Sequence, residues 1–198
     1  MTGYYDPHSV KRHVFQVKAI TRRRNPIFLS AFGGRPITEN QVLVAFPKAP
    51  VLLRDLKALS PRVIDVFLPP ETGFLSAFIK MKKTFGDTSQ EEAKRFAFAT
   101  FARIPQLKQV FIFDEDIDIY NRASVIWAMT TRVRPELDIH VIPRCPSSML
   151  EVAYGKERQP VSGKLIIDAT WKYQDFPARA EPAPEIMDKI NLKDYLEE

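Results

Sequence analysis

The sequence predicts an α/β fold in which a mostly parallel sheet carries helices on both faces. Apolar segments of strand length alternate with segments of helical periodicity from about residue 47 to residue 170, the pattern of a sheet with covering helices. Residues 108–113 are a nearly continuous apolar run, as expected of a central strand that is covered on both faces. A helical segment with Trp127 follows, after four carboxylates: Asp114, Glu115, Asp116 and Asp118.

Length and composition fit one sizeable domain, or one domain with a fragment of another. The chain has 198 residues, of which 45% are hydrophobic and 27% are charged. No apolar run approaches the roughly 18 residues of a membrane span, and the first residues lack a signal-peptide pattern. The single cysteine, Cys145, cannot form an internal disulfide. We therefore expect a cytoplasmic protein without a membrane segment.

The net charge of +5 is unevenly distributed, with a basic cluster at Arg22, Arg23 and Arg24 near Lys18. Such a cluster can mark a nucleic-acid site. No aromatic–glycine stacking motif, recognition-helix pattern or zinc-ligand spacing accompanies it. We therefore favour a solvated strand end, or an interface with an acidic partner surface, over nucleic-acid binding.

The first 40 residues do not follow the α/β rhythm. Residues 14–20 alternate between apolar and polar side chains, which predicts a half-buried strand. Loop signals follow at residues 25–26 and 33–36. We expect residues 1–40 to be the end of a preceding domain and residues 41–173 to be the α/β domain. Residues 174–198 would form a proline-rich loop and a tail helix.

The strands of the α/β domain are predicted from short apolar runs bounded by turn residues. Pro69 and Pro70 end the first predicted strand, residues 63–68, and the two predicted strands nearest the C-terminus are the shortest. The expected strands are residues 63–68, 74–81, 108–113, 139–142 and 165–167.

The helices are predicted from apolar residues at helical spacing and from capping residues. Thr88 and Glu91 fit a capping box, and Asn121 can cap the helix of Trp127, which we expect to be buried against the central strand. A tail helix is expected at residues 185–196. Two apolar stripes mark the buried helix faces. These are Leu52, Leu53, Leu56 and Leu59, after Pro47 and Pro50, and then Ala93, Phe96, Ala97, Thr100 and Phe101.

The carboxylates after residues 108–113 are the first candidate site. Ligands bind outside the carboxyl ends of strands in open α/β sheets, and carboxylate oxygens can hold a divalent cation. The spacing matches no calcium loop, because the required glycine and distal glutamate are missing. We therefore favour a solvated turn in which one aspartate caps the next element, and we name no metal ligand.

The other reactive side chains form no recognisable constellation. His8, His13 and His140 are not spaced as a metal pair, and Cys145, next to Arg144, has no histidine nearby. The sequence holds no nucleophile elbow, phosphate-binding glycine loop or dinucleotide fingerprint. The residues by themselves therefore identify no catalytic group.

Several segments, in order along the chain, resemble one enzyme family. Residues 17–27, VKAITRRRNPI, resemble a strand written V-x-A-I-T-x-R-x-x-P-I. Residues 1–6 resemble the stretch after an E-G-P-F-G-E motif. The remaining matches are residues 68–70, 78–81, 111–118, 126–132 and 166–170. Together they resemble the second half of the UbiD-family decarboxylases, and the preceding domain would then be split-barrel-like.

The resemblance implies cofactor chemistry. UbiD-type enzymes decarboxylate aromatic or α,β-unsaturated acids with prenylated FMN, which acts as an electron sink. A divalent metal accompanies the flavin, with potassium as a further candidate. A Glu–Arg–Glu network handles the proton, and by alignment Met1 follows the second glutamate of that network. We therefore name no catalytic residue here, and expect this chain alone to bind no cofactor.

The resemblance also implies a basic residue that reaches the flavin phosphate from the turn before the central strand. Arg103 lies nearest to that position, within one residue. A cation at a helix C-terminus, favoured by the helix dipole, is an equal alternative for Arg103.

The family's substrate pocket takes apolar residues from a loop after the R-x-R-P segment and from the segment after a G-G-R-x-x-T-like turn. In the family, the residue beside the second glutamate of the E-G-P-F-G-E motif borders the substrate acid. Some of these residues could equally belong to the core. The implied pocket residues here are Met1, Val44, Ala45, Ser148, Met149 and Leu150.

The function implied is that of the C-terminal portion or subunit of a UbiD-like carboxy-lyase, inactive alone. It would contribute to the substrate pocket and to oligomerisation. A homodimer and a separately encoded N-terminal half are the expected partners. The alternative is a non-catalytic oligomerisation or scaffold module, or a gene remnant.

Overall fold

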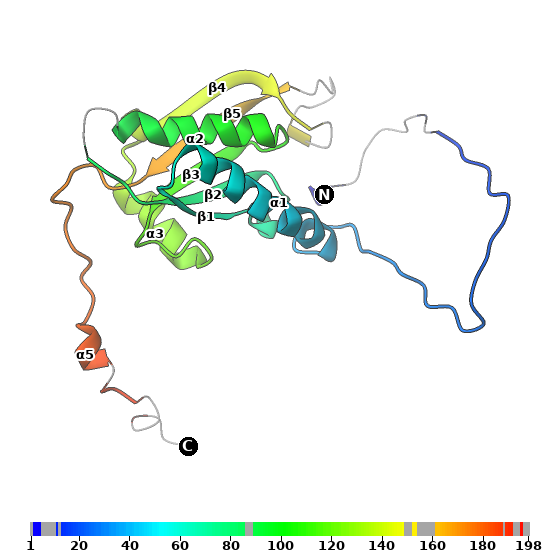
Figure 1. The fold of residues 1–198 in the computed structure, drawn as a ribbon, viewed down its shortest axis with the longest axis horizontal. Coiled ribbons are helices and arrows are strands. Elements are labelled where there is room, and N and C mark those ends of the chain that lie inside the picture. The colour runs from blue at the N-terminus through cyan, green and yellow to red at the C-terminus, as the bar shows by residue number, and fades with distance from the viewer. Residues whose placement is uncertain are drawn as a thin grey trace.

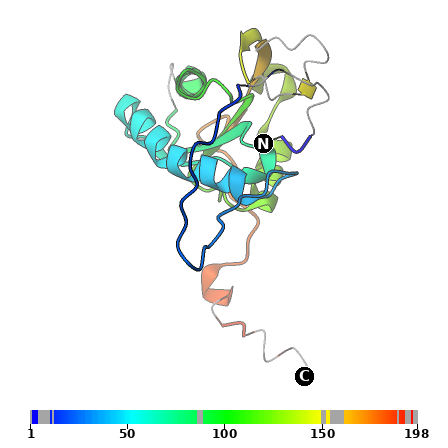
Figure 2. The ribbon, with the colours of Figure 1, turned by 90° about the vertical axis from the view of Figure 1, so that its right-hand side faces the viewer.

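The computed structural model describes residues 2–4, 11, 13–85, 89–148, 152–153, 161–187, 189–191 and 195, with the backbone alone at residues 89–91 and 184. A sheet and its helices form a compact body, the N-terminus lies beside it, and the C-terminal segment extends away from it (Figure 1). The N-terminal segment makes a long excursion to one side, and the C-terminal segment leaves from another (Figure 2).

The described sheet has five strands in the order β1-β2-β3-β5-β4. Strands β2 (Ser76–Met81), β3 (Gln109–Asp114) and β5 (Val161–Ala169) run parallel at its centre. The edge strands β1 (Val63–Phe67) and β4 (Ile139–Pro146) are antiparallel to their neighbours. The predicted mostly parallel sheet is confirmed, with β3 at its centre.

Alternate residues of β3 supply two cores, because successive side chains of a strand point to opposite faces. Val110 and Ile112 face the helices α1 (Glu39–Leu59) and α2 (Ser89–Arg103). Phe111 and Phe113 face the helix α3 (Arg122–Arg132). The prediction of helices on both faces is confirmed. A short helix, α4 (Pro135–Asp138), leads from α3 into β4.

Helix α1 begins well before the predicted leucine stripe and contains Pro47 and Pro50. Proline ordinarily weakens a helix interior, because its ring removes one backbone hydrogen bond. Here the N-terminus is closed by Thr38, whose N–H donates to Gln41 Oε1 at 2.8 Å. The buried stripe of Ala45, Leu52 and Leu56 then holds the helix on the sheet across both prolines.

The stripe predicted on α2 is buried as expected. Its capping box lies outside the described side chains. The cap of α3 is confirmed, because Asn121 Oδ1 accepts from the N–H groups of Ala123 at 2.9 Å and Ser124 at 3.3 Å. Trp127 is 40% exposed, so its predicted burial is wrong. Val125 and Ala128 take the buried positions instead.

The strand predicted at residues 14–20 is not formed. Within the described part of the chain these residues belong to no strand, and Val14 and Phe15 are among the most exposed apolar side chains. A strand is held by hydrogen bonds to a neighbour. No described segment pairs with residues 14–20, so the alternating pattern has nothing to form a sheet with.

The proline-rich loop after residue 174 is irregular, as predicted. The tail helix is much shorter than predicted, since α5 covers only Pro184–Met187. Of the residues after it, 189–191 and 195 are described and are not helical. Ile186 and Ile190 are exposed, and a short helix without packing is marginal in water.

Candidate functional site

A cavity of about 570 Å³ lies at the amino ends of β2 and β3, where the N-terminal segment reaches the body. We call it the amino-edge pocket. Its volume lies within the range of roughly 300–1,000 Å³ typical of small-molecule sites. The lining comes from residues 2–4, 35–36 and 71–73 with Leu75, from Lys108, and from residues 152–153.

Close backbone approaches shape this pocket. Gly3 has φ +85°, and a Cβ there would lie 2.8 Å from Arg35 Cα, so only glycine fits. The opposite wall is the 3-10 turn Pro70–Thr72, which ends at Gly73 with φ 64°. The Thr72 hydroxyl donates to the Pro69 carbonyl at 2.8 Å, which fixes that turn.

The pocket is lined by two cations and one carboxylate. The sheet holds the backbone of Lys108, whose N–H donates to the Leu75 carbonyl at 2.7 Å and whose carbonyl accepts from Leu165 N–H at 2.8 Å. Glu71 Oε1 accepts from Arg122 Nε at 2.8 Å. Glu71 Oε2 is buried without a hydrogen-bond partner among the described atoms. Arg35 and Lys108 can bind an anionic group in the pocket. Glu71 Oε2 is the acceptor that can receive a hydrogen bond from a bound molecule.

A second, largely apolar groove of about 340 Å³ lies between α1 and β1. Ala45, Phe46 and Leu53 line one side of this apolar groove. At its rim the Tyr120 hydroxyl donates to Asp65 Oδ2 at 2.9 Å. Burial and the Asp65 carboxylate raise the pKa of Tyr120 to about 12, so the phenol stays a hydrogen-bond donor.

The predicted pocket residues do not gather in one place. Ala45 lines the apolar groove, Val44 packs half-buried on the core beside it, and Ser148 is half-buried and lines neither cavity. Met1, Met149 and Leu150 lie outside the described residues. Their close neighbours along the chain, Thr2 and Val152, both line the amino-edge pocket.

Arg103 lies in the last turn of α2, and its Nε is 2.8 Å from Asp55 Oδ2 on α1. It lines none of the described cavities. Lys108 is the basic residue directly before β3, and it does line the amino-edge pocket. Lys108 could have been predicted from the sequence, because it is the basic residue in the turn directly before the central strand.

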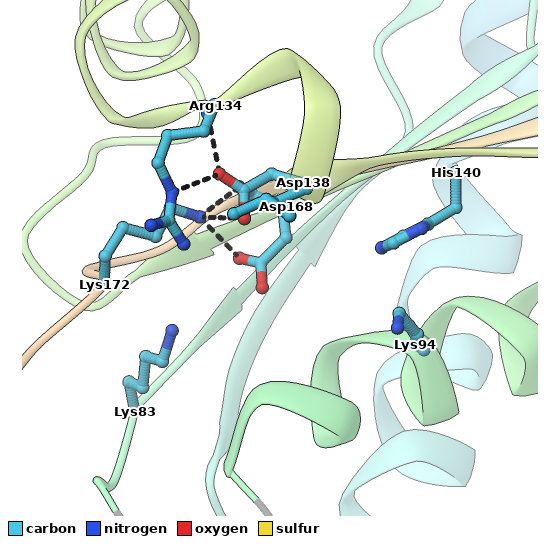
Figure 3. Close-up of a pocket in the computed structure, with 8 residues that line it drawn as sticks. Lys83, Lys94, Arg134, Asp138, His140, Asp168 and Lys172 are labelled. Atoms are coloured by element: carbon cyan, nitrogen blue, oxygen red, sulfur yellow. Dashed lines mark hydrogen bonds and ion pairs between the residues drawn. The ribbon is translucent and has the colours of Figure 1, made fainter.

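A third cavity, of about 230 Å³, lies at the opposite, carboxyl edge of the sheet. We call it the carboxyl-edge pocket (Figure 3). Lys172 Nζ lies 3.0 Å from Asp138 Oδ1 and 3.8 Å from Asp168 Oδ1. Burial lowers the pKa of Lys83, although Asp168 acts in the opposite direction. No sequence pattern pointed to this pocket, because its residues come from strand ends and helices far apart in the chain.

Of the four carboxylates at the end of β3, Asp114 and Asp116 form ion pairs, whereas Glu115 and Asp118 are exposed, as expected of a solvated turn. Asp114 is only 1% exposed and lies 3.2 Å from Arg132 Nη1. Asp116 receives two bonds from Arg132, at 2.9 and 2.6 Å, and one from Arg179 at 3.1 Å. Among the described residues, no three His, Cys, Asp or Glu side chains gather as a metal site. Two arginines therefore neutralise this strand end.

The two aspartates differ in pKa. Burial raises the pKa of Asp114 to about 6. The hydrogen bond from the Trp171 N–H and the charge of Arg132 lower this pKa but do not outweigh burial. Burial also acts on Asp116, but the hydrogen bonds and charges of Arg132 and Arg179 outweigh it and lower the Asp116 pKa.

Two family profiles match the chain. Residues 41–169 match the 3-octaprenyl-4-hydroxybenzoate carboxy-lyase C-terminal domain, and residues 1–36 match the Rift-related domain of the same carboxy-lyase. The amino-edge pocket is lined by residues from both matched segments. The chain belongs to the UbiD family.

Solved structures of UbiD-class enzymes resemble the fold. Vanillic acid decarboxylase from Sedimentibacter hydroxybenzoicus, in its closed form, is 30% identical with a TM-score of 0.70, covering 89% of this chain and 37% of that chain. The UbiD-class enzyme HmfF from Pelotomaculum thermopropionicum, in complex with FMN, is 30% identical with a TM-score of 0.68 over 80% and 34%. An evolved dimeric form of HmfF in complex with prFMN is 30% identical with a TM-score of 0.61 over 80% and 32%.

This chain thus spans about a third of the length of these solved relatives. None of the described helices is long and apolar enough to cross a membrane.

Proposed function

We propose that this chain is the C-terminal portion of a UbiD-like carboxy-lyase that acts on an aromatic or α,β-unsaturated carboxylic acid. One observation carries the proposal. The amino-edge pocket lies where the segment matching the Rift-related domain meets the segment matching the C-terminal domain, and both line it. A cavity formed between two parts of a family enzyme is a common place for its ligand.

The residues of the amino-edge pocket fit part of a flavin site. Lys108 and Arg35 would bind the flavin phosphate as cations, and Glu71 Oε2 offers a buried acceptor for a donor group. Prenylated FMN supplies the electron sink for decarboxylation when it is bound. We assign no metal or potassium ligand to this chain.

Arg103 remains the alternative phosphate contact. Its ion pair with Asp55 supports the role of a helix-end cation, whereas the place of Lys108 in the pocket supports contact with the flavin. Substitution of each residue separates the two assignments.

The proposal extends to the organisation of the protein. Residues 1–40 would complete a split-barrel-like domain supplied elsewhere, residues 41–173 would form the α/β domain, and residues 174–198 the tail. The catalytic network of the family would come from the part of the enzyme outside these 198 residues. The protein would be cytoplasmic, would form a homodimer and would not bind nucleic acid. We expect the chain alone to be colourless and inactive.

Co-expression tests the proposed function. The chain is produced with a candidate N-terminal half and a prenyl-flavin source, and flavin absorbance is measured in the purified complex. We expect flavin in the complex and none in the chain alone. Lys108→Gln should lower flavin occupancy about tenfold, since a charge-assisted contact is lost, while Arg103→Gln leaves it unchanged.

Flavin binding and turnover by this chain alone would overturn the proposed dependence on a second part. If Arg103→Gln loses flavin and Lys108→Gln does not, the contact with the flavin phosphate is assigned to Arg103. A complex that assembles yet never binds flavin would favour a scaffold module.

A further inference from the structure

The carboxyl-edge pocket lies where α/β sheets generally bind ligands. Its lining residues come from the segments after β2 and β5, from α2, and from the α4–β4 region. In open α/β sheets ligands bind outside the carboxyl ends of the strands. This pocket is at the other edge of the sheet from the amino-edge pocket, so its occupant is distinct from the flavin of the proposed function.

Lys83, two residues after β2, is a half-buried lysine in the lining of this pocket. Its Nζ donates to Thr170 Oγ1 at 2.6 Å and to the Trp171 carbonyl. Both acceptors are neutral, and Lys83 forms no ion pair within the part of the chain that the structure describes. A neutral amine has two N–H donors, so it can make both contacts and still keep its nitrogen lone pair for reaction.

The oxygen of Thr170 leaves that lone pair unoccupied. The Thr170 hydroxyl donates to Asp168 Oδ1 at 2.6 Å, so its oxygen can only accept from Lys83. Lys172 Nζ lies 3.8 Å from Asp168 Oδ1 and 3.0 Å from Asp138 Oδ1, which holds a second ammonium in the same pocket. The Lys83 amine is directed toward Lys172 and Asp168 (Figure 3).

The surroundings of Lys83 favour its neutral amine. Burial is the largest effect and lowers the pKa of Lys83, and the positive charge of Lys172 acts in the same direction. Three carboxylates oppose this shift without outweighing it: Asp168, Asp114 and Asp138. The other charged or titratable groups of the lining are Lys94, Arg134 and His140. Desolvation and a neighbouring cation are the two conditions that activate a lysine amine for attack on a carbonyl group.

We propose that Lys83 is a nucleophile that forms a Schiff base with a small carbonyl compound in the carboxyl-edge pocket. The geometry that carries the proposal is an amine in a cavity, with neutral acceptors on its N–H groups and an ammonium beside it. The cavity of about 230 Å³ is below the roughly 300–1,000 Å³ of cofactor-sized sites, so the compound is a small aldehyde or keto acid.

The reaction is an addition followed by loss of water. The Lys83 lone pair forms the C–N bond as the carbonyl π bond opens, and one amine proton moves to the oxygen to give a carbinolamine. Lys172 donates a proton to that hydroxyl group, which leaves as water while the C=N bond forms. The resulting iminium returns a proton to Lys172, so one water is released and no group is oxidised or reduced.

Reductive labelling of the full chain with propanal and cyanoborohydride at pH 7, followed by peptide mass spectrometry, measures the reactivity of each lysine. We expect Lys83 to be labelled at least about tenfold faster than Lys82. Lys82 is the matched comparison, because it is exposed, adjacent in sequence and outside the pocket lining. The labelling rate of Lys83 should also level off at a lower pH than that of an ordinary lysine.

Two variants test the role of the neighbouring cation. Lys172→Gln should slow the labelling of Lys83 about fivefold, because it removes a charge that favours the neutral amine. Lys82→Gln removes a cation next to Lys83 in sequence but outside the pocket, and should leave the rate unchanged. Equal slowing in both variants would contradict activation by Lys172. If Lys172→Gln does not fold, the comparison of Lys83 with Lys82 in the wild type decides.

The same labelling with pyruvate separates the two classes of carbonyl compound. A larger ratio of Lys83 to Lys82 labelling with pyruvate assigns the pocket to a keto acid, and a larger ratio with propanal assigns it to a neutral aldehyde. Labelling of Lys83 no faster than Lys82 with both probes overturns the proposal and leaves Lys83 as a tie between β2 and the segment after β5.

Discussion

At the scale of the residue, Arg132 explains how Asp114 and Asp116 can lie at the end of a buried strand. Its guanidinium bonds to Asp114 and to both oxygens of Asp116, and it lies 5.2 Å from the centroid of the Trp127 ring. The Arg179 guanidinium lies at the same distance from that ring. These two guanidinium groups contact the Trp127 ring, which is 40% exposed.

Removal of Arg132 should strongly destabilise the fold. Arg132→Met leaves the buried Asp114 with an uncompensated charge and Asp116 with Arg179 as its remaining cation, and breaking a buried pair costs about 3–5 kcal/mol. Urea unfolding measures the change. Arg54→Gln is the control, since Arg54 belongs to an exposed pair with Asp55 worth less than about 1 kcal/mol. Equal losses in both variants would show that Arg132 has no special role.

Asp114 should make the stability of the protein fall as pH rises. Its folded pKa of about 6 lies above the ordinary value near 3.9. The folded state therefore binds more protons between these values, and stability is lost as pH increases through that window. Relative to Asp114→Asn, the unfolding free energy of the wild type should drop by about 2 kcal/mol from pH 4.5 to pH 7.5. A constant difference between the two proteins would contradict the raised pKa.

At the scale of the element, α2 shows one buried face and one exposed face within three residues. Phe96 is 0% exposed in the core, whereas Phe98 is 53% exposed. Phe96→Ala should cost about 3–5 kcal/mol through lost burial and a cavity, and Phe98→Ala less than about 1 kcal/mol. Chemical denaturation of both variants gives the comparison. Similar costs would mean that α2 packs through a different face.

The local signals explain which elements could be predicted. The apolar run of β3 and the Asn121 cap of α3 are each encoded within a few residues, so sequence patterns found them. Strand β4 was predicted only to residue 142, whereas it continues through Pro143 to Pro146. An edge strand tolerates proline, since one side of it needs no ladder bonds.

The sites were less predictable than the fold, because they depend on contacts between distant segments. Asp114 and Asp116 are neutralised by Arg132 and by Arg179, which lies 63 residues beyond Asp116. The carboxyl-edge pocket likewise joins Lys83 to Asp168 across the sheet. No local periodicity records such pairs, whereas Lys108 could be inferred from its place before β3.

At the scale of the whole molecule, the N-terminal segment and the tail run outside the body (Figure 1), and both carry exposed apolar side chains. Val14, Phe15 and Phe28 are exposed in the N-terminal segment, and Ile186, Met187 and Ile190 in the tail. Contiguous exposed apolar groups usually mark a surface that is covered by a partner. The body of the protein, in contrast, contains two cores of buried apolar residues.

We therefore expect the tail to mediate self-association. Docking on a second subunit would bury the apolar side chains of α5 and allow its helix to extend, since packing stabilises a helix that is marginal alone. The full chain should behave as a dimer in size-exclusion chromatography with light scattering, and deletion of the residues after Pro184 should shift it toward monomer. Ile186→Glu with Ile190→Glu should act in the same way, and Glu185→Gln should not. A monomer at high concentration that none of these changes affects would refute the role of the tail.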